Sequence, residues 1–230
     1  MKKRSWGKFK LYVLISYLSF HKEEEILHLT RDIIKGGADV IQLRVANKSD
    51  KEFLSIATKI KKLTCKFKIP FIINNRLDIA LAIDAEGVHL GQDDLPIESA
   101  RKIAPRKLIG KSTHSLKEAL KAAKETADYI SIGPIFHSPT KPNLSPIDLN
   151  LIPQIKKKVK IPLIAIGGIN LNNIKQVLKA GVEGVAISSA ITKAENPKVT
   201  TRRFKKMLEV SDCTDKKRDY NDKSKIRLSP

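Results

Sequence analysis

Eight short apolar segments alternate with eight longer amphipathic segments along the 230 residues of this chain. A continuous apolar run of about four to eight residues is typical of a strand that is buried on both faces. Such strands are expected at residues 11–16, 39–44, 70–74, 87–91, 107–112, 128–133, 162–167 and 184–189. Because each strand leads into a helical segment, the pattern predicts a parallel sheet covered by helices.

The amphipathic segments carry the signals that start and stop helices. Helices are expected at 22–37, 49–67, 76–84, 96–104, 115–127, 150–159 and 170–181, with a last one within 196–210. Ser49, Ser115 and Asn170 stand where a side chain can accept a hydrogen bond from the first helical turn. Gly36 and Gly181 stand where helices commonly end.

The number of strand–helix units favours a closed barrel over an open sheet. Eight units in a chain of this length predict an α/β fold, a single (β/α)₈ TIM barrel. A doubly wound sheet is the alternative, but the first strand is not followed by the GxGxxG turn of dinucleotide-binding sheets. We expect the barrel domain to span residues 1–210 and a basic, disordered tail to span 211–230, where apolar periodicity is lost.

The formal net charge of +20 favours anionic partners. Much of this charge lies at the chain ends and beside acids on helical segments, and no zinc, recognition-helix or RNA-binding signature is present. We therefore expect a solvated, lysine-rich surface and no nucleic-acid partner. The cysteines, Cys65 and Cys213, lack metal-binding spacing, which favours reduced thiols in the cytoplasm. No apolar run reaches the length of a membrane span, so we expect no membrane partner.

Polar residues follow nearly every predicted strand. In such barrels the active site lies at the carboxyl ends of the strands. Gln42 and Arg44 are two residues apart, so both side chains face the same side of their strand, and a buried arginine requires a partner. We interpret them as one wall of an anion pocket. The other strand ends contribute Asn74, Asn75, Arg76, His89, Gln92, Asp93, Asp94, Lys111, Ser112, Thr113, His114, Ser138, Thr140, Lys141, Gly167, Gly168, Asn170, Ser188 and Ser189.

Two anion sites are suggested by these strand ends. Gly168 lets backbone N–H groups approach a phosphate closely, and Ser188 and Ser189 add hydroxyl groups; a tight turn is the alternative role of the glycine. Arg44 can hold phosphate oxygens bidentately, with amide hydrogens from Gln42 and Asn74 and a point charge from Lys141. Mg²⁺ held by Asp94 would suit a diphosphate there. The alternatives are a helix cap for Asp94 and an ordinary loop lysine for Lys141.

Acid–base groups are sparse. His89 is expected to be a hydrogen-bonded core histidine, and His114 and His137 have no visible carboxylate partner. No nucleophile–base pair stands out. The chemistry is therefore expected to depend on positioning and on charge stabilisation around a leaving diphosphate.

Six segments closely resemble the thiamine-phosphate synthase family, which also includes thiazole tautomerase. They are GADVIQLR at 37–44, PFIINNRLDIALAIDAEGVHLGQDDLP at 70–96, IGKSTHSLKEA at 109–119, DYISIGPIFHSPTK at 128–141, IPLIAIGGIN at 161–170 and GVAISSAI at 184–191. The resemblance implies that 4-amino-2-methyl-5-hydroxymethylpyrimidine diphosphate loses diphosphate with the help of Mg²⁺. The nitrogen of 4-methyl-5-(2-phosphoethyl)thiazole, in its carboxylated form, then attacks the pyrimidine cation to give thiamine phosphate.

The resemblance also implies roles for single residues. Arg44, Lys141 and Ser112 would be catalytic, with Ser112 on the pyrimidine side. The diphosphate substrate would contact Gln42, Arg44 and Asn74, and Mg²⁺ would be held by Asp94 and Asn75. Ser138, Thr140 and Lys141 would lie where the two substrates meet, and the thiazole phosphate would be held by Gly168, Ser188 and Ser189.

Two positions depart from the family pattern. The lysine that normally follows the strand-2 motif is Ala46 here, and an aspartate after strand 3 is Asn75. Lys48 and Lys111 are candidate replacements for the missing charge. The departures keep two alternatives open: an isomerase like thiazole tautomerase, or a barrel that binds phosphorylated ligands without catalysis. Pro134 argues against the isomerase, because that branch carries a proton-transferring histidine at this position.

Overall fold

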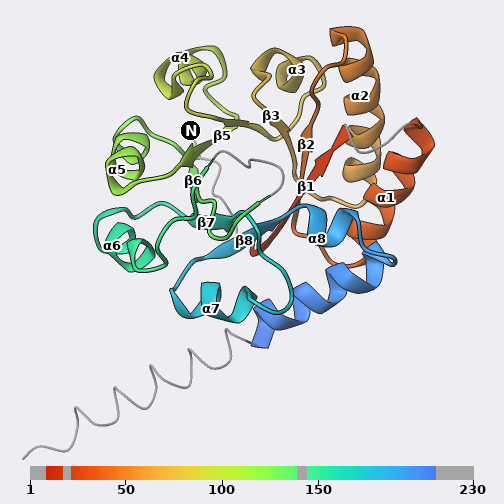
Figure 1. Cartoon of the computed structure of the whole chain (residues 1–230). Coiled ribbons are helices and arrows are strands. Elements are labelled where there is room, and N and C mark those ends of the chain that lie inside the picture. Colours follow the sequence, from red (N-terminus) through yellow and green to blue (C-terminus); the bar gives the residue numbers. More distant parts are fainter. Residues whose placement is uncertain (1–8, 18–21, 139–143, 211–230) are drawn as a thin grey trace, which may run out of the picture.

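A barrel of eight parallel strands forms the centre of the molecule (Figure 1). The structure, a computed structural model, describes residues 9–17, 22–138 and 144–210. The strands are β1 (Leu11–Ser16), β2 (Val40–Arg44), β3 (Phe71–Asn74), β4 (Gly87–Leu90), β5 (Leu108–Thr113), β6 (Tyr129–Ile132), β7 (Leu163–Ile166) and β8 (Gly184–Ile187). Each strand pairs with the next one in the sequence, and β1 pairs with β8 to close the barrel. The predicted (β/α)₈ fold is confirmed.

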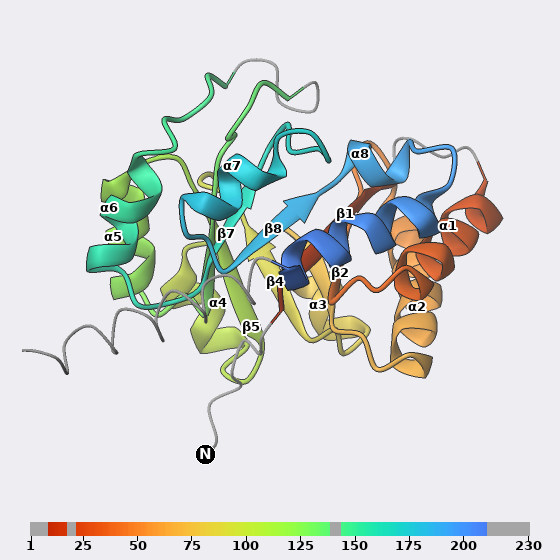
Figure 2. The ribbon, with the colours of Figure 1, turned by 90° about the horizontal axis from the view of Figure 1, so that it is seen from below.

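Helices surround the barrel and separate its strands from solvent (Figures 1 and 2). They are α1 (Glu23–Lys35), α2 (Asp50–Lys66), α3 (Leu77–Ala82), α4 (Ile97–Ile103), α5 (Leu116–Lys124), α6 (Leu151–Lys158), α7 (Ile174–Lys179) and α8 (Ser189–Thr192). A further helix over 197–210 lies against α1. Gly36 allows this close approach, because a Cβ atom there would lie 2.6 Å from Cβ of Thr201.

Two of the three predicted helix caps are confirmed. Ser49 forms a capping box with Glu52, and the Ser115 hydroxyl accepts a hydrogen bond from the backbone N–H of Glu118. The prediction for Asn170 was wrong in position, because its side chain accepts from the backbone N–H of Asn172 in a turn that precedes α7. Local hydrogen bonding by asparagine competes with helix formation, and so the helix begins four residues later than expected.

The interior of the barrel is filled by a cluster of buried side chains: Tyr12, Val40, Ile72, Leu108, Tyr129, Ile164 and Ala186. Tyr12 of β1 and Tyr129 of β6 meet there, with their hydroxyl oxygens 3.0 Å apart. Gly110 of β5 provides the space, because a Cβ atom at this position would lie 2.1 Å from Cζ of Tyr129. A second, larger apolar cluster fills the space between the strands and the helices. The barrel is therefore a packed core whose polar groups are left at its ends.

An acidic residue stands immediately before each even-numbered strand, at the amino-terminal face. Each carboxylate accepts a hydrogen bond from the backbone at the start of the preceding odd-numbered strand, and each forms an ion pair with a basic residue of one of the surrounding helices. The four sets are Asp39 with Leu11 N and Lys205, Glu86 with Phe71 N and Lys61, Asp128 with Ile109 N and Arg101, and Glu183 with Leu163 N and Lys156. The repeated contact ties strands and helices together at the face opposite the site described below.

The described residues contain no helix that is long and apolar enough to span a membrane.

Candidate active site

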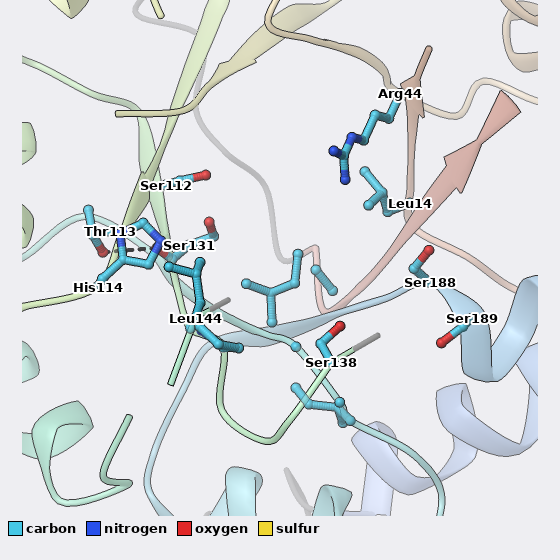
Figure 3. A pocket seen from close by; sticks show the side chains of 17 residues that line it. Leu14, Arg44, Ser112, Thr113, His114, Ser131, Ser138, Leu144, Ser188 and Ser189 are labelled. Atoms are coloured by element: carbon cyan, nitrogen blue, oxygen red, sulfur yellow. Dashed lines mark hydrogen bonds between the residues drawn. The ribbon is translucent and has the colours of Figure 1, made fainter. Parts of the chain in front are cut away.

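A cavity opens among the carboxyl ends of the strands, where the sequence placed the site. It is lined by Leu14, Arg44, Ser112, Thr113, His114, Ser131, Gly133, Pro134, Ser138, Leu144, Ile166, Gly167, Gly168, Ile169, Ala186, Ser188 and Ser189. Figure 3 shows Ser112 and His114 on one side of this space and Ser188 and Ser189 on the other, with the Arg44 guanidinium between them. Five predicted site residues with polar side chains therefore line one cavity: Arg44, Ser112, Ser138, Ser188 and Ser189.

Arg44 is the last residue of β2 and supplies positive charge to the cavity. Within the part of the chain that the structure describes, no carboxylate forms an ion pair with it. Gln42, two residues earlier, is 3% exposed and donates from Nε2 to Oδ1 of Asn74, at 3.3 Å. Gln42 and Asn74 do not line the cavity themselves. They form a polar pair at the neighbouring ends of β2 and β3, beside Arg44.

Gly167 and Gly168 shape the opposite wall of the cavity. Their φ angles are +101° and +64°, in the left-handed region that glycine adopts without strain. A Cβ atom on Gly168 would lie 2.5 Å from the carbonyl oxygen of His137, so the backbone packs closely against the β6–α6 connection. The Asn173 side chain donates to the Gly168 carbonyl at 2.9 Å and fixes this turn. The two roles considered for Gly168, a tight turn and a backbone that can approach a phosphate, are therefore compatible.

Ser112 is held in place by a hydrogen-bond network inside the barrel. His89 is 7% exposed, and its Nε2 lies 3.0 Å from the Ser112 hydroxyl and 3.3 Å from that of Ser131. Nδ1 of His89 lies 3.0 Å from the hydroxyl of Tyr129. Burial raises the pKa of Tyr129, and burial together with the neighbouring Tyr129 raises the pKa of Tyr12, so both phenols stay protonated. The prediction of a hydrogen-bonded core histidine is confirmed.

His114 has a partner that the sequence analysis missed. Its Nδ1 lies 3.1 Å from Oε2 of Glu118, and the same oxygen accepts the backbone N–H of His114 at 2.7 Å. The expectation of no carboxylate partner was wrong, because a residue just before a helix meets the first turn of that helix. The four-residue spacing between His114 and Glu118 is the sequence feature that could have predicted this contact.

Asn75 and Asp94 lie beyond the ends of β3 and β4 and do not line the cavity. Asn75 has a φ angle of +66°, and its Oδ1 accepts a hydrogen bond from Asn74 at 2.6 Å. Oδ2 of Asp94 accepts the backbone N–H of Gly91 at 2.5 Å. The helix-cap alternative for Asp94 was wrong, because the N-cap of α4 is Pro96 and no side chain caps it.

The oxygen donors at this edge suit Mg²⁺ only with help from a ligand. No group of three or more histidine, cysteine, aspartate or glutamate residues in the described ranges could hold a metal ion. Asp94 keeps one carboxylate oxygen free of the Gly91 contact, and Asn75 offers a neutral amide oxygen. Magnesium is commonly held by one or two protein oxygens together with substrate phosphates and water, and this sparse donor set fits that pattern.

Neither candidate replacement for the missing charge reaches the cavity. Lys48 forms an exposed ion pair with Glu52 at 3.3 Å and lies over the ring of Tyr17. Lys111 is buried, and its Nζ donates to the carbonyl of Gly91 at 2.6 Å. The predicted site residues Thr140 and Lys141, like Cys213 and the tail at 211–230, lie outside the described residues.

Comparisons with known proteins agree with this architecture. The chain is 46% identical to the thiamine-phosphate synthase of Clostridium novyi over 190 residues, which are 82% of this chain and 93% of that protein. It is 41% identical to the Shouchella clausii thiamine-phosphate synthase over 203 residues, covering 87% of this chain and 97% of that one. The solved thiamine phosphate pyrophosphorylase from Pyrococcus furiosus superposes with a TM-score of 0.81 at 41% identity, covering 89% of this chain and 97% of that one.

More distant structures share only the barrel. 3-Hexulose-6-phosphate synthase is 22% identical, with a TM-score of 0.67 over 88% of this chain and 99% of that one. A family model described as thiamine monophosphate synthase matches residues 11–191, which include all eight strands. The chain therefore belongs to the thiamine monophosphate synthase family.

Proposed function

We propose that this protein is a thiamine-phosphate synthase, a transferase of thiamine biosynthesis. Its substrates would be 4-amino-2-methyl-5-hydroxymethylpyrimidine diphosphate and the carboxylated form of 4-methyl-5-(2-phosphoethyl)thiazole. The observation that carries the proposal is the placement of Arg44, without a carboxylate partner among the described residues, in the same cavity as Gly168, Ser188 and Ser189. One cavity thus offers donors for two separate phosphorylated groups.

The diphosphate would bind on the Arg44 side. A guanidinium presents paired N–H groups that match phosphate oxygens, and the partly closed cavity strengthens that attraction relative to open water. Asp94 and Asn75 would hold Mg²⁺, which would neutralise charge on the leaving diphosphate. Lys141, a predicted ligand outside the described residues, would add a further positive charge.

The thiazole phosphate would bind beyond the ends of β7 and β8, at Gly168, Ser188 and Ser189. Hydroxyl groups and backbone N–H groups bind a phosphate monoester without adding a fixed charge. The two phosphorylated groups would then lie at two separate places in one cavity, which leaves the reacting carbon and the thiazole nitrogen between them. The C–O bond to diphosphate breaks with its electrons moving to the diphosphate, and the lone pair of the thiazole nitrogen forms the new C–N bond. The carboxyl group of the thiazole then leaves as CO₂, and the ring carbon keeps the electron pair of the broken C–C bond and takes up a proton from solvent to give thiamine phosphate.

The residues of the cavity suit a reaction in which little proton transfer is needed. Ser112 would orient the pyrimidine, and His89, inside the barrel, would fix the Ser112 hydroxyl by a hydrogen bond. His114 is engaged with Glu118. The C–N bond forms without a general base because the attacking nitrogen carries no proton. The site therefore acts by positioning and by stabilising the departing charge.

The thiazole isomerase remains the second candidate because Ala46 and Asn75 weaken the expected diphosphate site. Pro134, which lines the cavity, opposes it, since the position offers no proton-transferring group. We also propose a cytoplasmic enzyme, in line with the exposed free thiol of Cys65.

The proposal is tested by supplying the purified protein with both substrates and Mg²⁺ and measuring thiamine phosphate and released diphosphate. We expect both products in equal amounts, and no reaction when the metal is chelated. Arg44→Gln should lower kcat/KM for the pyrimidine diphosphate by roughly 100-fold, and Arg44→Lys by roughly tenfold, because the lysine keeps the charge and loses bidentate contact. Isomerised thiazole phosphate without pyrimidine would identify the isomerase, and binding without any product would identify the non-catalytic barrel.

A further inference from the structure

Lys111 is a buried lysine for which the proposed reaction has no use. It lies in β5, next to Ser112, and is 8% exposed. Ser112 lines the cavity and Lys111 does not; the Lys111 side chain instead reaches the loop after β4. A lysine is rarely buried unless its ammonium group has a partner. The partner of Lys111 therefore indicates what this side chain does.

The ammonium group of Lys111 binds the backbone at the start of the loop that carries Asp94. Its Nζ donates to the carbonyl of Gly91 at 2.6 Å, and Gly91 is the first residue after β4. The backbone N–H of Gly91 in turn donates to Oδ2 of Asp94 at 2.5 Å. Gly91 is thus held on its carbonyl side by Lys111 and on its N–H side by Asp94.

A second contact ties the same loop to the same strand. Nε2 of Gln92 donates to the backbone carbonyl of Ser112 at 2.5 Å. Two consecutive residues of β5 therefore anchor two consecutive residues of the loop, by contacts that span twenty positions in the sequence. The loop is short, so the position of Gly91 fixes the direction from which the Asp94 carboxylate approaches the mouth of the barrel.

The electrostatics agree with this geometry. Burial lowers the pKa of Lys111, and the Asp94 carboxylate opposes that shift. The two charges therefore lie close enough to interact, with the Gly91 peptide groups between them. A neutral side chain of the same length would lose the contact with the Gly91 carbonyl and leave that loop end unanchored.

We propose that Lys111 is a positioning residue for Asp94: it fixes Gly91 so that the Asp94 carboxylate is presented to a magnesium-bound diphosphate. This inference rests on the proposed function, in which Asp94 is a magnesium ligand. Removing Lys111 would change the affinity for the cation in two ways, and these have opposite signs. Loss of a nearby positive charge alone would strengthen cation binding, whereas loss of positioning would weaken it, so the direction of the change decides between them.

The test measures binding of Mn²⁺, used as a paramagnetic substitute for Mg²⁺, in the presence of inorganic diphosphate by electron paramagnetic resonance. We expect Lys111→Met to weaken Mn²⁺ binding about tenfold, which is the scale of one charge-assisted hydrogen bond. Lys111→Arg, which keeps a charged donor, should stay within about threefold of the unchanged protein. Asp94→Asn should also weaken binding, which establishes that the measured ion is the one at Asp94.

A matched control exists at the opposite face of the barrel. Lys156 also donates to a glycine carbonyl, that of Gly181 at 2.5 Å, far from the mouth. Lys156→Met should leave Mn²⁺ binding unchanged. Hydrogen exchange supplies an independent readout: the amides of residues 91–95 should exchange faster in Lys111→Met and remain unchanged in Lys156→Met.

Each outcome has a defined meaning. Unchanged or tighter Mn²⁺ binding by Lys111→Met overturns the inference, as does an equal loss in Lys156→Met. If Lys111→Met does not fold, Lys111→Leu, which also lacks a donor, replaces it, and equal Mn²⁺ binding by the leucine and arginine variants overturns the inference. A protein that binds Mn²⁺ with diphosphate in the expected order of variants, yet makes no thiamine phosphate, would contradict the synthase proposal and leave the role of Lys111 standing.

Discussion

Arg101 and Asp128 form a salt bridge with an N–O distance of 2.6 Å at the amino-terminal face of the barrel. The same carboxylate oxygen accepts the backbone N–H of Ile109 at 2.8 Å, and the aspartate side chain is 7% exposed. The pair thus joins α4 to β5 and β6 at the end away from the cavity. Three further acids, Asp39, Glu86 and Glu183, make the equivalent contacts around the ring. These contacts fix the end of the barrel that lies opposite the candidate site.

Replacing Arg101 with methionine is expected to lower the free energy of unfolding by about 2–3 kcal/mol, because it leaves a mostly buried carboxylate without its cation. Lys121→Met removes an exposed pair with Glu125 at 3.7 Å and should cost less than about 0.5 kcal/mol. Urea denaturation of both variants measures the difference. An equal loss in the free energy of unfolding would show that the buried pair contributes no more than the exposed pair. We expect kcat to be unchanged in both variants.

Replacing Ala46 with lysine restores the cation that the family pattern places after β2. If the missing charge limits diphosphate departure, Ala46→Lys should raise kcat by roughly tenfold, the effect of one charge-assisted contact. Steady-state kinetics at saturating Mg²⁺ measures this, with Ala46→Met as the control for side-chain bulk. A rate that stays the same or falls would count against the missing charge as the limit.

Replacing Asn75 with aspartate should lower the Mg²⁺ concentration that gives half-maximal rate, by roughly tenfold. The φ angle of +66° at this position is one that asparagine and aspartate both tolerate, so the backbone should not change. Titration of the rate with Mg²⁺ measures the effect. Asn75 accepts a hydrogen bond from Asn74, and an aspartate oxygen can accept the same bond, so the variant adds a charge without removing that contact. An unchanged half-maximal concentration would place the metal elsewhere.

Replacing Gly168 with alanine should both destabilise the protein and weaken thiazole phosphate binding. The new Cβ atom would lie 2.5 Å from a carbonyl oxygen at a φ angle of +64°, so the backbone must move. We expect a loss of more than about 2 kcal/mol of stability and a raised KM for the thiazole phosphate. Gly37→Ala is the control: its φ angle is +99°, but the nearest contact is 3.4 Å, and it should cost about 1 kcal/mol and leave KM unchanged.

Replacing Tyr129 with phenylalanine tests the buried phenols through their pH dependence. The raised pKa values mean that the folded state holds both protons, so wild-type stability is complete below about pH 10, the unfolded pKa, and falls as the pH rises above it. The variant should be less stable by about 1–2 kcal/mol at pH 8, through the lost hydrogen bonds. Above pH 10 that gap should narrow by up to about 1.4 kcal/mol per pH unit. Urea midpoints at pH 8 and pH 10.5 measure it, and a constant gap would contradict the burial of the Tyr129 proton.

The fold was largely predictable because its signals are local. All eight strands were placed to within two residues of each boundary, since strand burial appears directly as an apolar run. The error in α7 arose where Asn170, Asn172 and Asn173 form hydrogen bonds with one another rather than with a helix. That competition depends on turn geometry, which residue types alone do not specify.

The candidate site was predictable as a set of strand ends and not as a set of contacts. Arg44, Ser112, Ser138, Ser188 and Ser189 share one cavity because the carboxyl ends of parallel strands meet at one face of a closed barrel. Gln42 and Asn74 were correctly grouped, but they bond to each other rather than line the cavity.

The sequence by itself determined that eight buried strands alternate with helices, and that polar groups suited to phosphate follow those strands. Only the tertiary structure decided which of these groups meet: that Lys111 holds Gly91, that His89 supports Ser112, and that Asp128 pairs with Arg101. The physical reason is the distance along the sequence over which each kind of signal acts. Hydrophobic periodicity is a property of neighbouring residues, whereas each of these contacts joins side chains or backbone groups at least twenty positions apart, which come together only when the barrel closes.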